Sequence, residues 1–261
     1  MEWSLPVTSP TGTQAVDRAA QLLIEVARNR DPVSFAELTA ASGLAKSTTS
    51  RLLTALERNG LIRRDLTGRF SPGGVFLSYA WRGGAESDLV AIAQPVLAWL
   101  GDQTAETINL GVARDTGQVE QIAQVDSTYL IGGTNWVGLT VPLHCAALGK
   151  VLLAYGAAEL PAGRLERRTA RTITSRAALG AELAAVRERG YAVTIEELEP
   201  GLIAVAAPVV AGSGAVVAAL SVSGPASRLS GGQLTAATES CLAAARSLSA
   251  LLGYDQEEGT S

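Results

Sequence analysis

The chain has 261 residues, of which 47% are apolar, and its formal net charge is −4. This length exceeds that of a typical single domain, so we expect two domains and a connector. The net charge argues against a uniformly basic nucleic-acid binder, but the charge is unevenly distributed. Residues 11–73 hold nine Lys and Arg against six Asp and Glu, and the remainder holds 12 against 19. A small cationic segment joined to an acidic body is typical of a DNA-binding module attached to another domain.

The cysteines and the hydropathy pattern argue against several classes of protein. Cys145 and Cys241 are far apart and lack metal-ligand spacing, which argues against a disulfide framework or a zinc site and fits a reducing cytoplasm. Residues 1–10 lack the basic flank and apolar run of a signal peptide and are predicted to be a disordered lead. Residues 202–224 are free of charge, but Pro208 and the Gly-Ser-Gly at 212–214 divide them into two buried strands rather than a membrane span.

The N-terminal region predicts three helices with short connections. Apolar residues at helical spacing predict the first helix over residues 13–29. Ser34 and Glu37 match a capping box and begin a second, short helix that ends at Ser42. Gly43 then leaves a short turn before a third helix within the stretch GLAKSTTSRLLTALERNGL, residues 43–61. This spacing predicts a helix-turn-helix.

The third predicted helix has two faces of different chemistry. Leu52, Leu53 and Leu56 share one face, and the opposite face carries Ser47, Ser50, Arg51, Thr54 and Arg58. Ser, Thr and Arg are residue types that reach phosphates and base edges in a DNA groove. Taken alone, the helix fits an ordinary solvated polar face better than a DNA-reading one.

A basic hairpin is predicted directly after this helix. Leu61-Ile62 and Arg69-Phe70 flank a Thr67-Gly68 turn and are able to pair as strands, with Arg63, Arg64 and Arg69 projecting from them. Three helices followed by such a hairpin form a winged helix-turn-helix, which we assign to residues 11–73. The combination favours DNA binding, because a solvated helix explains neither the capped partner helix nor the arginine-rich hairpin.

The rest of the chain predicts an α+β domain over residues 89–253, after a linker helix over 74–88 and before a disordered tail over 254–261. The helical pattern is interrupted at Gly83-Gly84, with Asp88 as the N-cap of the next helix. Strands are predicted at 107–114, 118–125 and 128–132, then helices at 144–156 and 176–189. Strands at 191–195 and within 202–224 and a helix at 231–252 complete an antiparallel sheet covered on one side.

Six blocks in this order resemble the IclR family of bacterial transcriptional regulators. They are AVDRAAQLLIEVA; LAKSTTSRLLTALERNGLIRRD with GRFSPG; VPLHCAALGKVLLAYG; RTITSRAALGAELAAVRERGYAV; EELEPGLIAVAAPV; and VVAALSVSGPASRLS. The resemblance implies a dimeric or tetrameric regulator. It also implies a winged helix-turn-helix and a GAF-like effector-binding domain that takes a small, usually acidic or aromatic metabolite.

The resemblance also implies an effector pocket, by position, at Leu130, Gly133, Trp136, Val141, Ala147, Leu148, Thr194, Leu202, Ala204, Ser221 and Ser223. Thr194 stands where the family often has an aspartate and Ala204 where it often has a cysteine, so the pocket is less polar and the inference to a very small carboxylate weakens. The Ser221 and Ser223 hydroxyls would orient a ligand oxygen, or would be buried serines satisfied by the backbone. Trp136 would line an aromatic site or lie exposed in a loop.

Catalytic chemistry finds little support in the sequence. His144 and Cys145 point to opposite faces of a strand and lack an orienting third group. The stretch LGKVLL lacks the earlier glycine and the hydroxyl of a phosphate-binding loop, and EELE at residues 196–199 is a charged turn by default. Neither a metal nor a cofactor is predicted.

Three functions compete on this basis. The leading one is a ligand-responsive DNA-binding repressor or activator, whose symmetric dimer binds a pseudo-palindromic operator and does not enter the membrane. In it, Ser47, Ser50, Arg51 and Thr54 read bases, and Lys46, Arg58, Arg63, Arg64 and Arg69 mostly bind phosphates. The DNA-binding set also includes Thr48, and Arg18, which either touches the DNA backbone or forms a structural salt bridge. The alternatives are an enzyme with an appended assembly domain and a ligand-insensitive architectural DNA binder.

Overall fold

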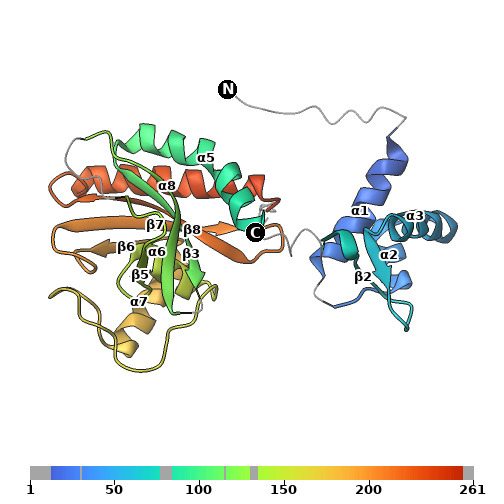
Figure 1. The fold of residues 1–261 in the computed structure, drawn as a ribbon, viewed down its shortest axis with the longest axis horizontal. Coiled ribbons are helices and arrows are strands. Elements are labelled where there is room, and N and C mark those ends of the chain that lie inside the picture. The colour runs from blue at the N-terminus through green and yellow to red at the C-terminus, as the bar shows by residue number, and fades with distance from the viewer. Residues whose placement is uncertain (1–12, 30, 77–83, 115, 130–134, 255–261) are drawn as a thin grey trace. The chain divides into compact units, whose positions relative to one another are not determined.

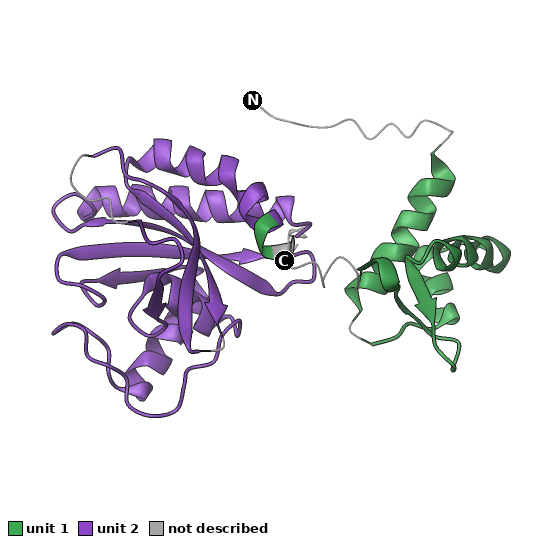
Figure 2. Cartoon of the chain, in the orientation of Figure 1, with its two compact units in different colours: residues 1–87 green, residues 88–261 purple. Residues whose placement is uncertain are grey.

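The computed structural model describes residues 13–29, 31–76, 84–114, 116–129 and 135–254 (Figure 1). The chain divides into two compact units, residues 1–87 and 88–261 (Figure 2). The predicted disordered lead lies outside the described residues, and so does the predicted tail after Tyr254. None of the described helices is long and apolar enough to cross a membrane.

The first unit contains three helices and a hairpin. These are α1 (Gln14–Arg28), α2 (Phe35–Ser42), α3 (Lys46–Arg58), β1 (Ile62–Arg64) and β2 (Phe70–Pro72). Their apolar faces meet in one small core, to which α1 contributes Leu22, α2 contributes Leu38, α3 contributes Leu53 and the hairpin contributes Phe70. The three predicted helices and the hairpin are therefore confirmed.

Local interactions set the start and the end of α2. The Ser34 hydroxyl accepts a hydrogen bond from the Glu37 N–H at 3.2 Å, and the Glu37 carboxylate accepts one from the Ser34 N–H at 2.6 Å. This is the predicted capping box, and it satisfies backbone donors that a helix start leaves unpaired. Gly43 ends α2 with φ of +63°, a left-handed conformation that glycine adopts without a steric penalty. The tight turn then places α3 directly after α2.

The hairpin is closed by an aspartate. β1 and β2 pair antiparallel with Ile62 opposite Pro72 and Arg64 opposite Phe70. At the tip, the Asp65 carboxylate accepts hydrogen bonds from the Thr67 N–H at 2.8 Å and the Arg69 N–H at 2.9 Å. These bonds hold the pKa of Asp65 below its ordinary value, and the hydroxyl of Thr67 is the largest cause. The turn is thus fixed by side-chain to backbone hydrogen bonds.

The second unit is built on one antiparallel sheet of six strands in the order β5-β4-β3-β8-β7-β6. The strands are β3 (Thr107–Arg114), β4 (Gln118–Val125), β5 (Thr140–Pro142), β6 (Ala192–Ile195), β7 (Leu202–Val210) and β8 (Val216–Pro225). The helices are α5 (Gly84–Thr104), α6 (Ala147–Ala154), α7 (Arg176–Arg189) and α8 (Gly231–Leu251). Apolar and small residues dominate β7 and β8, as expected for strands buried on both faces.

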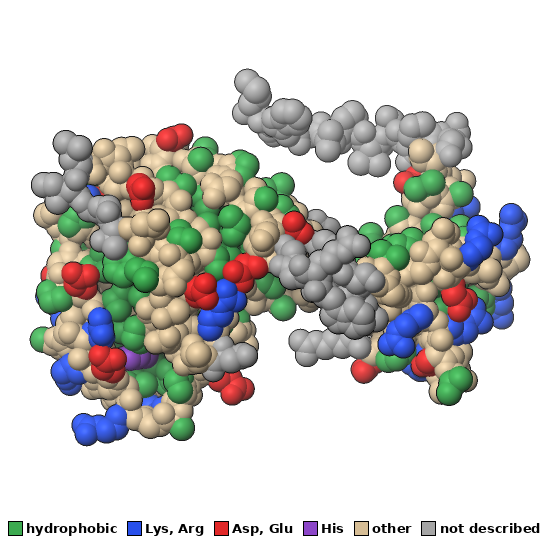
Figure 3. Space-filling view, viewed as in Figure 1, with side chains coloured by type: hydrophobic (Ala, Val, Ile, Leu, Met, Phe, Trp, Pro, Cys, Tyr) green, Lys and Arg blue, Asp and Glu red, His purple; other side chains and the backbone are tan. Residues whose placement is uncertain are grey.

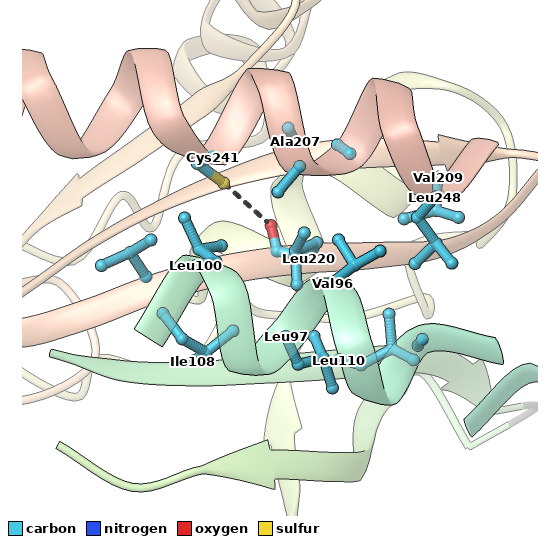
Figure 4. Packing of buried hydrophobic residues seen from close by; sticks show 14 of the residues in the cluster. Val96, Leu97, Leu100, Ile108, Leu110, Ala207, Val209, Leu220, Cys241 and Leu248 are labelled. Atoms are coloured by element: carbon cyan, nitrogen blue, oxygen red, sulfur yellow. Dashed lines mark hydrogen bonds between the residues drawn. The ribbon is translucent and has the colours of Figure 1, made fainter. Parts of the chain in front are cut away.

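Helices cover both faces of this sheet, so the prediction of one covered side is wrong. Helices α5 and α8 lie on one face, where alternate residues of β7, such as Val205 and Ala207, pack with Leu97 and Leu248 (Figures 1 and 4). Helix α6 lies on the other face against Ala206 of β7, and α7 packs against α6. The reason is the strand sequence itself, because a side chain on either face of β7 is apolar and needs cover.

Two further predictions differ from the structure, and a third is covered only in part by the described residues. Thr128 and Tyr129 are not in a strand, residues 130–132 lie outside the described part, and β5 pairs with β4 instead. Asp88 does not cap a helix, because α5 begins at Gly84 and already contains it. Residues 74–76 are helical, but residues 77–83 lie outside the described part, so the linker helix over 74–88 stays a prediction.

Candidate functional site

The polar face of α3 is exposed, and its apolar face is buried in the core of the first unit. Thr49, Leu53 and Leu56 are buried. The exposed residues are Ser47, Ser50, Arg51, Thr54 and Arg58, and Lys46 at the helix start is exposed as well, whereas Thr48 is half-buried. Within the described part of the chain, no residue forms a hydrogen bond or an ion pair with the side chains of Arg51 and Arg58. Both guanidinium groups therefore keep their donors for an external partner.

The start of α3 adds backbone donors to this face. Its N-cap is Ala45, whose side chain accepts no hydrogen bond, so the first N–H groups of the helix are not capped as those of α2 are. Free N–H groups and the positive end of the helix dipole attract phosphate oxygens. Lys46 adds a positive charge at the same end.

The arginines of the hairpin do not all project freely. Arg63 is exposed and, among the residues that the structure describes, has no hydrogen-bond or ion-pair partner. Arg64 stacks over the ring of Phe70 at 4.7 Å and lies 3.5 Å from a Glu57 oxygen. Arg69 donates a hydrogen bond to the Pro32 carbonyl at 2.6 Å. Arg63 is thus the hairpin arginine that is freest to reach a phosphate.

Positive charge gathers on the first unit around these elements (Figure 3). Arg18 on α1 is half-buried, and within the described residues it forms no salt bridge, so its DNA contact stays a prediction. Besides Glu57, Glu37 is an acidic neighbour of the hairpin, 3.9 Å from Arg69. The Ser34 hydroxyl and backbone hold the pKa of Glu37 below its ordinary value, so this carboxylate is engaged in capping α2.

The second unit contains a pocket on the α6 face of its sheet. Its cavity volume is about 60 Å³. Nine residues predicted for the effector pocket line it: Trp136, Val141, Ala147, Leu148, Thr194, Leu202, Ala204, Ser221 and Ser223. Leu130 and Gly133 lie outside the described residues. That these residues bind an effector stays a prediction, but they do converge on one cavity.

Strand register explains why distant residues meet here. Asn109 of β3 lies opposite Ser221 of β8, Ser223 lies opposite Ala204 of β7, and Ala204 lies opposite Thr194 of β6. Residues in such lateral pairs point to the same face of a sheet. The pocket wall is therefore a row across four strands, and α6 supplies the facing residues.

Four further residues line this pocket and are not among the predicted ones, namely Asn109, Gln121, Ala146 and Leu198. Asn109 carries a signal that the sequence shows: its amide lies between Ile108 and Leu110, in the apolar middle of its strand. Gln121 does not, because its strand is polar at several positions. Only the pairing of Gln121 with Gly111 of β3 places it beside the pocket.

The two serines differ in how they are satisfied. The Ser223 hydroxyl donates to the Thr107 carbonyl at 3.4 Å and accepts from the Asn109 amide nitrogen at 3.3 Å. The reading of a serine satisfied by the backbone therefore holds for Ser223. Ser221 is buried, and within the described part of the chain its hydroxyl has no hydrogen-bond partner. Ser221 is the better placed of the two to bond a ligand.

A buried ion pair joins two of the segments that line the pocket. Lys150 of α6 is fully buried, and its ammonium group lies 2.5 Å from a carboxylate oxygen of Glu197. The reading of residues 196–199 as a charged turn is therefore wrong for Glu197, which is buried against α6. The pair ties α6 to the segment that carries Leu198, so it fixes two sides of the pocket relative to one another.

The environment of Cys145 opposes nucleophilic chemistry. Burial raises the pKa of its thiol to about 12, whereas a reactive cysteine needs a lowered pKa. The His144 ring is bonded through Nε2 to the Glu166 carbonyl at 2.8 Å. Among the described residues, no group of three or more His, Cys, Asp or Glu side chains is placed to hold a metal ion.

Two sequence profiles match the chain, one on each unit. The profile described as "Bacterial transcriptional regulator IclR C-terminal" matches residues 85–250, and the "IclR helix-turn-helix domain" profile matches residues 15–66. The second match contains α1 from its second residue onward, α2, α3 and β1, and the first contains every residue that lines the pocket.

Curated proteins and solved structures are similar over nearly the whole chain. The HTH-type transcriptional regulator BhcR of Paracoccus denitrificans is 34% identical over 91% of this chain and 87% of its own length. The acetate operon repressor of Salmonella typhimurium is 32% identical over 88% and 86%. A putative IclR transcriptional regulator from Silicibacter sp. TM1040 has a TM-score of 0.71 at 27% identity, covering 92% of this chain and 96% of its own. These relatives are transcriptional regulators and not enzymes.

Proposed function

This chain belongs to the IclR family of bacterial transcriptional regulators, and from that premise we propose how it reads DNA and how a ligand controls it. It is a DNA-binding regulator with an effector-binding domain. We assign the DNA contact to the exposed face of α3 and to the hairpin, and the effector to the pocket beside α6. Bacterial chromosomal DNA lies in the cytoplasm, so we propose that the protein acts there.

The observation that carries the DNA assignment is the free polar face of α3. Ser47, Ser50, Arg51 and Thr54 read base edges in the major groove, because they are exposed and do not contribute to the core. Phosphates are bound by Lys46, Thr48, Arg58 and Arg63, with the first N–H groups of α3. Arg64 and Arg69 shape the hairpin and reach phosphates only at its edge, and Arg18 contacts the DNA backbone.

A homodimer, alone or paired into a tetramer, places two such faces on the half-sites of a pseudo-palindrome. The effector acts by binding one arrangement of the dimer more tightly than another, which changes the population able to span both half-sites. The predicted class of effector was an organic acid or an aromatic compound. Trp136 in the pocket wall supports the aromatic part of that prediction.

The test is to map binding of the purified full chain on sheared fragments of the source genome at near-physiological salt. We expect discrete pseudo-palindromic sites and affinity that falls steeply with salt, because phosphate contacts release counterions. Binding that ignores sequence and disappears at physiological salt, with or without a metabolite extract, would contradict the proposal. A metabolite recovered chemically changed after incubation would support the enzyme alternative instead.

A further inference from the structure

Two buried amide oxygens in the wall of the pocket lack a hydrogen-bond partner. They are Asn109 Oδ1 and Gln121 Oε1, on side chains whose residues are only 4% and 5% exposed. Buried polar atoms in folded proteins are nearly always paired, so an exception calls for an explanation. The described residues hold three such atoms: these two amide oxygens belong to one pocket, and the third, Glu197 Oε2, does not line it.

The orientation of the Asn109 amide follows from its neighbours. The Ser223 hydroxyl donates its hydrogen to the Thr107 carbonyl, and its oxygen accepts a hydrogen bond from Asn109. The structure places the NH₂ group of Asn109 towards Ser223, which leaves Oδ1 as the atom without a partner. The wall therefore presents an acceptor and lacks the donor that would satisfy it.

The described residues that line the rest of the pocket carry no charged side chain. Its described lining has apolar side chains, among them Trp136, Leu148 and Leu202, and neutral polar ones, but no Lys, Arg, His, Asp or Glu. A ligand that fits this lining has one apolar face and carries hydrogen-bond donors along the opposite edge.

We propose that the pocket selects a small molecule with a vicinal diol on a compact ring, whose two hydroxyls donate to Asn109 Oδ1 and Gln121 Oε1. The proposal rests on the proposed function, because it names the ligand chemistry of the same pocket. It shifts the expected effector from an organic acid towards a dihydroxylated compound. The diol belongs either to an aromatic ring or to a saturated one, and both present the same two donors.

The first experiment compares probes that differ only in these donors. Catechol and cis-1,2-cyclohexanediol are titrated into the full chain by calorimetry beside 1,2-difluorobenzene and cis-1,2-difluorocyclohexane, which keep the shape and lose the donors. We expect at least tenfold tighter binding of one diol than of its difluoro analogue, because a site built around acceptors rejects a ligand that leaves them unpaired. Binding of catechol would indicate an aromatic ring in the natural ligand, and binding of cis-1,2-cyclohexanediol would indicate a saturated ring. Equal binding within both pairs, or binding of neither diol at millimolar concentration, overturns the proposal.

The second experiment uses variants of the acceptors. Asn109→Leu and Gln121→Met keep the shape and remove the oxygen, so the preference for the diol should fall at least tenfold. The melting temperature of Gln121→Met without ligand should equal or exceed that of the wild type, because an unpaired buried acceptor is removed. Asn109→Leu also loses the hydrogen bond from Nδ2 to Ser223, so the stability test uses Gln121→Met alone. A fall in the melting temperature of Gln121→Met would show that this amide serves the fold, and would overturn the proposal. Gln103→Met, at an exposed position of α5, is the matched control and should change neither quantity.

The two proposals fail in different ways. If the diol assignment is wrong and the regulator assignment is right, discrete operator sites remain and only the probe preference is absent. If the DNA assignment is wrong, operator sites are absent whatever the pocket binds.

Discussion

Arg51 occupies the middle of the exposed face of α3 and, within the described residues, has no internal partner. Arginine pairs with the O6 and N7 atoms of guanine, which makes it the most informative residue of the face. We expect Arg51→Ala to weaken operator binding by about 1–3 kcal/mol and to change binding to random DNA little. Fluorescence anisotropy with both duplexes measures the difference.

Arg58→Ala is the comparison for that measurement. Arg58 is exposed on the same helix, four residues before the hairpin begins, and is assigned to a phosphate. Its loss should weaken both duplexes to a similar extent and lower the salt dependence of binding. If Arg51→Ala behaves in the same way, Arg51 is a phosphate contact and not a reader of bases.

Individual residues were predictable where their role depends on local periodicity. The face of α3 follows from 3.6-residue spacing, so its exposed set was visible in the sequence. Gln121 was not predictable, since only the pairing of β4 with β3 places it at the pocket. Glu197 was misread because its partner, Lys150, is 47 residues away in the chain.

Helix α6 is positioned by a glycine at a close approach. A Cβ atom added to Gly149 would lie 2.3 Å from the Leu143 carbonyl oxygen, so backbone must move to accept it. We expect Gly149→Ala to lower the free energy of unfolding by about 1–3 kcal/mol through this overpacking. Urea denaturation measures the change.

Gly180 of α7 is the matched control for that substitution. An added Cβ there meets no atom within 4 Å, and the position is inside a helix. Gly180→Ala should therefore raise stability, by about 0.5–1 kcal/mol, because alanine restricts the unfolded chain. An equal loss at both positions would contradict the close approach at Gly149.

The elements themselves were largely predictable, and their partners were not. Helices α1 and α7 and strands β3, β4 and β6 lie within a residue of their predicted bounds, because apolar periodicity and caps are local. The edge strand β5 has only three residues, too few to show alternation, and it was missed. Which face each helix covers depends on the order of strands, and a pattern along one strand does not contain that order.

At the scale of the molecule, each unit has a hydrophobic core of its own. We expect calorimetry of the full chain to resolve two unfolding transitions. Operator duplex should raise the temperature of one of them only, because a ligand stabilises the state that binds it. A single transition that the duplex shifts as a whole would show that the units unfold together.

The division of charge predicted from composition agrees with this organisation. The cationic segment is the unit that carries α3 and the hairpin, and the acidic remainder carries the pocket. Composition was informative here because charge is summed along the chain and needs no knowledge of contacts.

Strand β8 belongs to both layers of the second unit. Leu220 and Val222 face the core with α5, whereas Ser221 and Ser223, alternating with them, face the pocket. A ligand in contact with Ser221 would therefore lie on the opposite face of β8 from α5, with only the backbone of this strand between them. Helix α5 is also the first helix of its unit along the chain, the one joined through residues 77–83 to the DNA-binding unit. Occupancy of the pocket and the packing of α5, the helix that follows the DNA-binding unit in the sequence, therefore depend on the same strand.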